Sequence, residues 1–595
     1  MAGSPLEHDH QHRSTLALPR APERVLPTRL DAAVFTLKVH AFRLRRAALN
    51  AVQPVARLPR GAATPAAVPI AWSRTALWSD PRVAERAMQR GKVHNLRMAA
   101  RSLDGTSLSP GALFSFWRQV GPPVRARGYV AGRMLQEGCL VASPGGGLCQ
   151  LSNAIYDVAL RAGCEIVERH AHSRLVPGSA AWTGRDATVA WNYVDLRFRS
   201  PAPMVLKVAL DEEFLTVTLW GAARSSTDSG AAEDVRADER RETAHDCATC
   251  GEDTCFRHRG GAGDDPGVTA FVVDDHWREF DDAMASVRKP GDMLCVPIDG
   301  ERWHKANYAW TREGMRVVTA PVQALRRALA SRRLAAQGAR RQIQFQDDAD
   351  RLAARFARSL GPDVTELYVT QAFLPWLWRN GYLGGRRFHV LMTRLPLGAL
   401  HERLDCASRA HPGRATLADF RADPDRVAAE AAALAAACTI LTPHRAVAAL
   451  FGSRARVLDW HRSTRPVQNA ASRSRRIVFP GPTVARKGAY ELREALRALR
   501  DVELAVVGGG HEGANFWDGI AICRYTGANW LEGAAAVVQP AFVEDRPRRL
   551  LQALGAGVPV IATSACGLPP QAGLTLIAPG DAGALRHAID AVLPG

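Results

Sequence analysis

A chain of 595 residues is too long to fold around one hydrophobic core, so two to four domains are expected. Hydrophobic residues make up 47% and charged residues 23%, which is an ordinary globular composition. The net charge of +18 indicates affinity for acidic ligands, or merely a GC-rich genome that encodes arginine in place of lysine. No basic patch is interleaved with aromatic residues in a nucleic-acid-binding motif, so no nucleic-acid partner is expected.

Neither a membrane-spanning segment nor an export signal is expected. The sequence contains no run of 18 apolar residues. Residues 1–19 are polar and lack the apolar core of a secretory signal. A cytoplasmic location follows, in which the 11 cysteines should be reduced, metal-bound or catalytic rather than paired.

The first 70 residues should form a disordered tail and a basic amphipathic helix over 31–50, which allows peripheral contact with an anionic membrane. Residues 71–221 are expected to form a compact α+β unit. The alternating pattern over 189–198 predicts one of its strands.

A hairpin is also predicted for this unit, from 204–210 and 214–220. Residues 222–267 are charged and poor in apolar side chains, as is typical of a linker. From 268 onward apolar strands alternate with long helices, which indicates βαβ units and parallel sheets. Two series of such strands predict two Rossmann-like domains, 268–435 and 436–595, the second beginning with a strand at 439–441.

Three consecutive glycines, Gly145 to Gly147, lead into Cys149 and a helical pattern over 149–162. Near a helix N-terminus the positive end of the helix dipole favours the thiolate, which is the nucleophilic form of cysteine. The alternative is that Cys149 is a small buried residue behind a tight turn.

A compact cysteine cluster lies inside the linker, with the spacing C-x2-C-x4-C-x2-H. Three thiolates and an imidazole suit tetrahedral Zn²⁺, and thiolates also suit an iron–sulfur cluster. A redox dithiol at Cys247 and Cys250 is the alternative. The predicted metal ligands are Cys247, Cys250, Cys255 and His258.

Residues 92–221 resemble the VanW family, which is tied to bacterial cell-envelope biology. The resemblance rests on an ordered series of motifs: 95–96, 103–105, 109–111, 114–117, 120–122, 128–129, 145–152, 168–173 and 184–187. Some members are proposed to use the cysteine of the glycine–cysteine motif in transpeptidation. The absence of an export signal counts against wall transpeptidation here.

The VanW resemblance implies that Cys149 is the nucleophile of this unit. His170 or His172 would be its base, and Asp186 or Glu168 would orient that base. The alternative is that both histidines are structural and that Glu168 belongs to a buried ion network.

Residues 268–595 resemble retaining GT-B glycosyltransferases, most clearly over 431–585. The motifs that carry the resemblance are 440–445, 478–481 with 486–488, 506–510, 537–540, 544, 550–554 and 557–563. It implies a nucleotide-sugar substrate whose diphosphate lies at a helix N-terminus. The residues implied for this site are Gly481, Arg486, Lys487, Gly509, Glu544, which is also catalytic, Arg548 and Gln552.

The sequence departs from the GT-B pattern in three places, one of which is the glycine-rich turn, replaced by residues 545–547. The second of two glutamates eight positions apart is replaced by Gln552, and the arginine expected two residues after Gly481 is replaced by Thr483. A degenerate structural module is therefore the alternative. His401 and Asp405 are candidates for the acceptor side only.

The sequence thus predicts an α+β VanW-like domain followed by an α/β GT-B-type pair of Rossmann-like domains. The expected function is sugar transfer from a nucleotide-sugar to a glycan or lipid-linked acceptor in bacterial cell-envelope synthesis, with the VanW-like domain as accessory. Two alternatives stay open. One is cysteine-dependent acyl transfer by the VanW-like domain, and the other is a non-catalytic binding scaffold.

Overall fold

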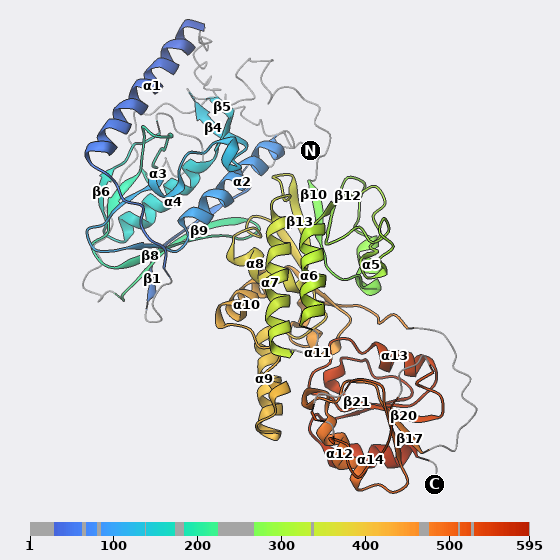
Figure 1. Cartoon of the computed structure of the whole chain (residues 1–595). Helices are drawn as coiled ribbons and strands as arrows, with labels where there is room; N and C mark the ends of the chain where they lie inside the picture. The colour runs from blue at the N-terminus through green and yellow to red at the C-terminus, as the bar shows by residue number, and fades with distance from the viewer. Residues whose placement is uncertain are drawn as a thin grey trace, which may run out of the picture.

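The chain forms three regions, drawn in Figure 1 from blue through green and yellow to red. None of the helices in the described ranges has the length and apolar character that crossing a membrane requires. The computed structural model describes residues 29–61, 67–79, 85–136, 139–172, 184–223, 267–334, 338–462, 475–509, 512–513, 515–524 and 529–593.

The first region is built on a four-stranded antiparallel sheet. In sheet order its strands are β1 (Val68–Ala76), β9 (Phe214–Gly221), β8 (Met204–Leu210) and β2 (Thr106–Leu108). Alternate side chains of β8 and β9 are buried, as expected where one face of a sheet packs on the core. The predicted hairpin is therefore confirmed. The helices that pack on this sheet are α2 (Arg86–Leu103) and α4 (Leu148–Arg161).

Two smaller sheets complete the first region. One is three-stranded, in the order β3 (Leu113–Ser115), β7 (Arg197–Arg199) and β6 (Glu165–Glu168). The other is a hairpin of β4 (Ala131–Gln136) and β5 (Cys139–Pro144). The short helix α3 (Phe116–Val120) follows β3 directly, with the Ser115 side chain as its N-terminal cap.

The strand predicted over 189–198 is wrong for most of its length. Only the last two of these residues belong to β7. Before them the chain reverses through a bridge between Ala190 and Val194, with Asn192 in the left-handed region at φ 59°. The carbonyl of Trp191 accepts a hydrogen bond from Arg43 of α1 (Arg29–Val52), a distant contact that sequence periodicity does not reveal.

Helix α1 lies on the first region by its polar side and exposes its apolar side. Arg46 pairs with Glu168, and Arg197 donates to the Asn50 carboxamide oxygen at 3.0 Å. Figure 1 shows this helix at the outer edge of the region. The apolar side chains that it exposes by 71% or more are Leu30, Leu37, Leu44 and Val52.

The second region is a seven-stranded parallel sheet. Its order is β12 (Arg316–Thr319), β11 (Met293–Val296), β10 (Val268–Val272), β13 (Val364–Thr370), β14 (Arg387–Leu391), β15 (Thr439–Thr442) and β16 (Ala455–Val457). Inner strands such as β11, β14 and β15 are buried on both faces because helices cover the sheet. The helices are α5 (Arg278–Ala285), α6 (Pro321–Arg333), α7 (Gly338–Ala357), α8 (Leu374–Arg379), α9 (Leu397–Ala410), α10 (Pro424–Ala436) and α11 (Arg445–Ala448).

The third region is a six-stranded parallel sheet. Its order is β19 (Ala521–Arg524), β18 (Glu503–Val506), β17 (Arg476–Phe479), β20 (Ala534–Gln539), β21 (Val560–Thr563) and β22 (Leu574–Ile577). Its helices are α12 (Ala489–Arg497), α13 (Arg548–Gly555) and α14 (Ala582–Val592). Short 3-10 turns in the chain are η2 (Arg125–Arg127), η5 (Ala306–Tyr308), η6 (Gln371–Phe373), η7 (Ala415–Leu417), η8 (Gly452–Arg454), η9 (Ala485–Lys487) and η10 (Ser564–Cys566).

The predicted pair of Rossmann-like sheets is confirmed, but β15 belongs to the first sheet and not to the second. It pairs with β14 on one side and β16 on the other, so the first sheet continues to residue 457. Residue types predicted the strand correctly. Its partner was not predictable from them, since a buried parallel strand fits either sheet equally well.

The first and second regions contact each other through main-chain and arginine hydrogen bonds. The Gly385 amide donates to the Asp211 carbonyl at 2.9 Å. Arg97 of α2 is buried and donates to the Gly384 carbonyl at 2.5 Å. Burial, with neighbouring arginines as a second cause, lowers the pKa of Arg97. These contacts fix the first region against the loop between α8 and β14.

Candidate functional site

Steric contacts account for the three glycines that lead from β5 into α4. A Cβ atom on Gly146 would lie 2.2 Å from the carbonyl oxygen of Gly132 in β4. Gly147 caps α4 with φ at 99°, where other residues are strained. Asn95 of α2 donates to the Gly146 carbonyl at 3.0 Å. The turn is therefore fixed on both sides, and it places Cys149 in the first turn of α4.

The structure brings together Cys149, His172 and Asp186. Asp186 Oδ2 lies 2.9 Å from His172 Nδ1, and it also accepts the His172 backbone N–H at 2.7 Å. The imidazole lies within reach of the Cys149 thiol and shifts its pKa, and the thiol also lies 3.9 Å from the Val189 carbonyl oxygen. Because Asp186 occupies Nδ1 of His172, Nε2 is the ring nitrogen that is available to the Cys149 sulfur. A carboxylate that orients an imidazole beside a thiol is the arrangement of an activated cysteine nucleophile.

Asp186 is held in place independently of the histidine. Its side chain is fully buried, and Arg169 donates to Asp186 Oδ1 at 2.7 Å. The next residue, Ala187, is hydrogen-bonded to side chains of α4 through both its carbonyl and its amide. The Ser152 hydroxyl donates to its carbonyl at 2.6 Å, and its amide donates to the Asn153 side chain at 2.8 Å. The helix that carries Cys149 therefore also positions the acid.

The three groups shift one another's pKa values. Burial alone would lower the pKa of His172, but its hydrogen bonds to Asp186 and Cys149 outweigh burial and raise it to about 9. Burial alone would raise the pKa of Cys149, but the bond to His172 and its charge lower it. Burial opposes ionisation of Asp186 too, yet hydrogen bonds from His172 hold its pKa well below the usual range. Both shifts move the pair toward thiolate and imidazolium, because the thiol pKa is lowered while the imidazole pKa is raised.

His170 and Glu168 lie in a separate contact. His170 is half exposed, and its Nε2 lies 3.4 Å from Glu168. Glu168 accepts hydrogen bonds from Arg46 of α1 and from the Asp195 amide, the latter at 3.1 Å. This carboxylate therefore joins α1 to the first region rather than orienting His172.

In the third region, Lys487 and Glu544 lie together where the carboxyl ends of β17 and β20 meet. Lys487 Nζ lies 3.0 Å from Glu544 Oε2 and donates to the Val543 carbonyl at 3.0 Å. Burial alone would raise the pKa of Glu544, but the charge of Lys487 and hydrogen bonds, including one from Gln539, lower it. The strand order reverses between β17 and β20, and parallel α/β sheets bind their ligands at such a switch point.

Gly481 and Gly509 follow the carboxyl ends of β17 and β18. The Gly509 carbonyl accepts the Thr483 amide at 2.9 Å, which joins the two loops. Thr483 is buried, and its hydroxyl accepts the Trp517 indole N–H at 3.1 Å. The position where the GT-B pattern has an arginine therefore joins the two loops, and the cations beside this loop are Lys487 and Arg549, whose guanidinium donates to the Pro480 carbonyl.

Arg548 and Arg486 both reach toward the second region. Arg548 makes a bidentate ion pair with the fully buried Glu279 of α5, at 2.5 and 2.7 Å. Arg486 lies over the Phe420 ring at 4.5 Å. Gln552 is exposed on α13. Two of the residues predicted to bind a donor, Arg548 and Arg486, therefore contact the second region.

Three residues at the same junction were not predicted. Arg394 follows β14, and its buried Nε has no hydrogen-bond partner among the described residues. His444 follows β15 and bonds to the Glu544 carbonyl at 2.9 Å. Burial raises the pKa of Asp545, and the nearby charges of Arg394 and His444 act in the opposite direction. The sequence could have indicated these residues, because each follows a predicted parallel strand and ligands bind at the carboxyl ends of such strands.

His401 and Asp405 lie on α9, and their partners belong to the segment between η7 and α10. The His401 ring accepts the Ala422 amide at 3.1 Å, and Asp405 pairs with Arg421 at 2.7 Å. The predicted metal ligands, Cys247, Cys250, Cys255 and His258, lie outside the described residues. Within the described part of the chain, no group of three or more His, Cys, Asp or Glu side chains could hold a metal ion.

Two family models match separate parts of the chain. Residues 91–220 match the family described as VanW like protein, and residues 474–594 match glycosyl transferases group 1. The chain thus joins a VanW-like region to a glycosyl transferase group 1 region.

Two curated proteins match the first of these regions. The uncharacterized protein YoaR of Bacillus subtilis (strain 168) is 33% identical over 135 residues, 22% of this chain and 44% of that protein. The Vancomycin B-type resistance protein VanW of Enterococcus faecalis is 35% identical over 130 residues, 21% of this chain and 47% of that protein. The chain therefore spans less than half the length of either relative.

Three solved structures each align with 55% of the chain, with low sequence identity and low TM-scores. Sucrose-phosphate synthase of Thermosynechococcus elongatus aligns over 89% of its length with 14% identity and a TM-score of 0.37. The lipopolysaccharide outer core galactosyltransferase WaaB aligns over 90% of its length, with 13% identity and a TM-score of 0.33. Anabaena HepE, solved with UDP and glucose, aligns over 89% with 12% identity and a TM-score of 0.33.

Proposed function

We propose that the protein is a retaining glycosyltransferase that takes a sugar from a nucleotide-sugar and adds it to a glycan or lipid-linked acceptor of the bacterial cell envelope. One observation carries the proposal. Lys487 and Glu544 form a buried pair, 3.0 Å apart, at the ligand-binding edge of the sheet in the glycosyl transferase group 1 region.

The charges around this pair suit a nucleoside diphosphate that leaves as an anion. Lys487 supplies a cation below the loop that contains Gly481, and Arg394 supplies a second cation from the facing domain with a free Nε–H among the described residues. Positive groups fixed before the reaction stabilise the charge that develops on the leaving diphosphate. Glu544, held ionised by Lys487, has the acceptor oxygens needed to bind sugar hydroxyls.

A thermal-shift series tests this proposal. UDP, GDP and their glucose conjugates should raise the melting temperature, with one nucleotide preferred, because ligands that bind the folded state stabilise it. Lys487→Met should abolish the rise. Arg497→Ala, an exposed substitution on α12, should keep it. A rise of equal size in Lys487→Met, or no rise with any nucleotide, contradicts the proposal.

The Cys149–His172–Asp186 contacts favour a second candidate, acyl transfer in the VanW-like region. The thiolate would attack an amide carbonyl, and the His172 imidazolium would protonate the departing amine, which leaves a thioester on Cys149. An acceptor amine would then attack the thioester and release Cys149 as the thiolate, while neutral His172 takes up the proton that the amine loses. This chemistry uses no residue of the glycosyl transferase region, so both activities can coexist in one chain.

We also propose that α1 contacts an anionic membrane from the cytoplasmic side, where nucleotide-sugars are made. Its leucines face solvent, since the polar side of the helix is occupied by the first region. The cations Lys38 and Arg45 are exposed on the same helix. An exposed apolar stripe flanked by cations is the arrangement of helices that lie in the interface of an anionic bilayer.

A further inference from the structure

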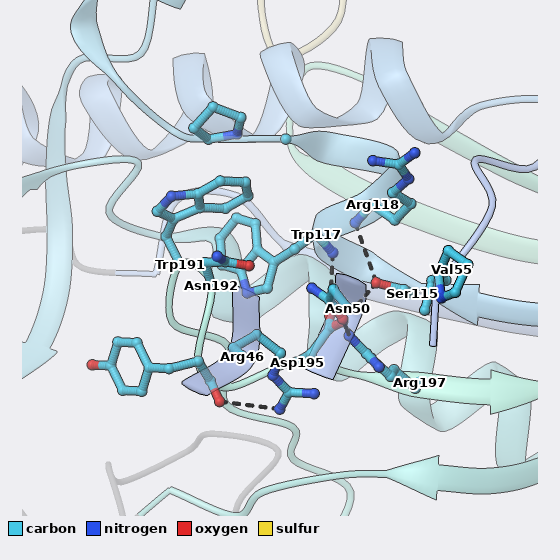
Figure 2. A pocket seen from close by; sticks show the side chains of 14 residues that line it. Arg46, Asn50, Val55, Ser115, Trp117, Arg118, Trp191, Asn192, Asp195 and Arg197 are labelled. Carbon is cyan, nitrogen blue, oxygen red and sulfur yellow. Dashed lines mark hydrogen bonds and ion pairs between the residues drawn. The ribbon is translucent and has the colours of Figure 1, made fainter. Parts of the chain in front are cut away.

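A cavity of about 270 Å³ opens between α1 and the two segments of the first region that carry Trp117 and Trp191. Figure 2 shows it from close by. Neither Cys149, His172 nor Asp186 lines it, so it is separate from the cysteine site. Its lining residues are Arg46, Asn50, Pro54, Val55, Ser115, Trp117, Arg118, Gly121, Pro122, Trp191, Asn192, Tyr193, Asp195 and Arg197.

Two tryptophans form an aromatic corner in this cavity. The rings of Trp117 and Trp191 meet edge to face, with centroids 5.4 Å apart and planes at 89°. Trp117 is fixed because its indole N–H donates to the Val194 carbonyl at 2.8 Å. Trp191 is held by its own carbonyl, which accepts from Arg43. Trp117 is only 6% exposed, so the ring surface that a ligand can reach belongs mainly to Trp191, and this rigid face loses little entropy when a ligand packs on it.

The carboxylate that lines the cavity is already saturated with donors. Asp195 accepts hydrogen bonds from the Ser115 hydroxyl at 2.6 Å and from Arg197 Nε at 2.8 Å. It also accepts the backbone amides of Trp117 and Leu196. The cavity consequently presents no free anionic acceptor from this residue to a ligand.

Hydrogen-bond donors, in contrast, remain open. Within the described part of the chain the Arg118 guanidinium makes no hydrogen bond or ion pair, and only its backbone amide is engaged. The Asn192 carboxamide is likewise unengaged there, and Asn50 uses only its oxygen, to accept from Arg197. A site with spare donors and a spare positive charge selects a ligand that is rich in acceptors and anionic.

We propose that this cavity binds a single sugar unit that carries a carboxylate or a phosphate. The C–H face of a pyranose ring packs on Trp117 or Trp191, its hydroxyls accept from Asn192 and Asn50, and its anionic group pairs with Arg118. The volume lies just below the range of about 300–1,000 Å³ that holds drug-sized ligands, and it fits one sugar ring. The site goes beyond the proposed sugar transfer and does not depend on it.

Ligand-observed saturation-transfer NMR on the full chain tests this site with glucuronate, glucose 1-phosphate and glucose. The two anionic sugars should receive saturation and glucose much less. Which anion binds more tightly identifies a carboxylate or a phosphate as the natural group. Trp191→Ala should remove the signal, and Arg118→Ala should weaken binding about tenfold, as expected for one lost charge-assisted contact. The matched controls are Trp72→Ala and Arg125→Ala, both exposed in the same region and outside the cavity.

Competition with UDP separates this site from the donor site. Excess UDP should leave the glucuronate signal unchanged, because the cavity lies in another domain from Lys487. Displacement by UDP would assign the binding to the glycosyl transferase region and overturn the proposal. Equal signals from glucose and the anionic sugars would overturn it as well, and so would full binding in both cavity variants. Loss of the UDP thermal shift alone would instead count against the proposed function.

Discussion

The first region gathers its reactive side chains inside one domain, whereas the parallel-sheet half distributes its charged side chains over the junction of two domains. Cys149, His172 and Asp186 contact one another and are fixed by a glycine turn and by α4. At the predicted donor site, the Arg548 guanidinium donates two hydrogen bonds to Glu279 of the facing domain. The cysteine site is thus complete without domain movement, while the donor site depends on how its two domains are placed.

Alkylation of Cys149 should show the largest effect of a substitution. At pH 7 His172→Asn should slow the reaction of Cys149 with iodoacetamide by up to roughly 30-fold, because the substitution removes the partner that lowers the thiol pKa and an ordinary thiol is only a few per cent ionised there. Peptide mapping by mass spectrometry assigns the rate to this cysteine. The matched control is His170→Asn, which should react as the unmodified protein does.

The pH profile sharpens the same test. The His172 imidazolium, with its pKa at about 9, lowers the pKa of the Cys149 thiol, so the rate should level off at a lower pH than it does for an ordinary thiol. In His172→Asn the rate should instead rise with pH until the ordinary thiol pKa is passed. Equal slowing by His170→Asn would contradict the assignment of the base.

Arg548→Met tests whether the donor site and the domain junction use the same arginine. It leaves the buried Glu279 carboxylate without this partner, which should lower the free energy of unfolding by about 1–3 kcal/mol, discounted because Arg548 is 40% exposed. Urea denaturation measures the loss, and Arg548→Met with Glu279→Gln should recover part of it. The thermal shift with UDP should persist. If the UDP thermal shift disappears in a folded Arg548→Met variant, Arg548 binds the donor after all.

Vesicle binding should show the smallest effect. Leu37→Glu with Leu44→Glu should reduce cosedimentation with phosphatidylglycerol vesicles at least about tenfold, since two apolar contacts are lost and negative charge is added. Both side chains are more than 70% exposed, so the fold should be unaffected. A double substitution at exposed Arg497 and Arg125 to Ala is the control for lost general charge. Unchanged sedimentation of the leucine variant would contradict membrane contact by α1.

Local chemistry in the sequence was sufficient for several features. The glycine run before Cys149 predicted a turn into a helix, because only glycine tolerates φ at 99° next to packed main chain. Apolar runs predicted the parallel strands, since their periodicity follows from burial on both faces. The glycine–cysteine motif was found in the same way, from residue types at short spacing, whereas Lys487 was implied by the resemblance of its strand–loop to GT-B glycosyltransferases.

Contacts between distant segments were decided only by the tertiary structure. Both His170 and His172 suited the role of base, and the choice followed from which of them reached Asp186. Arg548 looked like a phosphate ligand until the facing domain supplied Glu279. The cavity beside Trp117 needs α1, whose Arg46 is 71 positions away in the chain and reaches it only through packing. Periodicity describes a residue's own element, whereas partners across domains depend on how the elements pack, which no local pattern encodes.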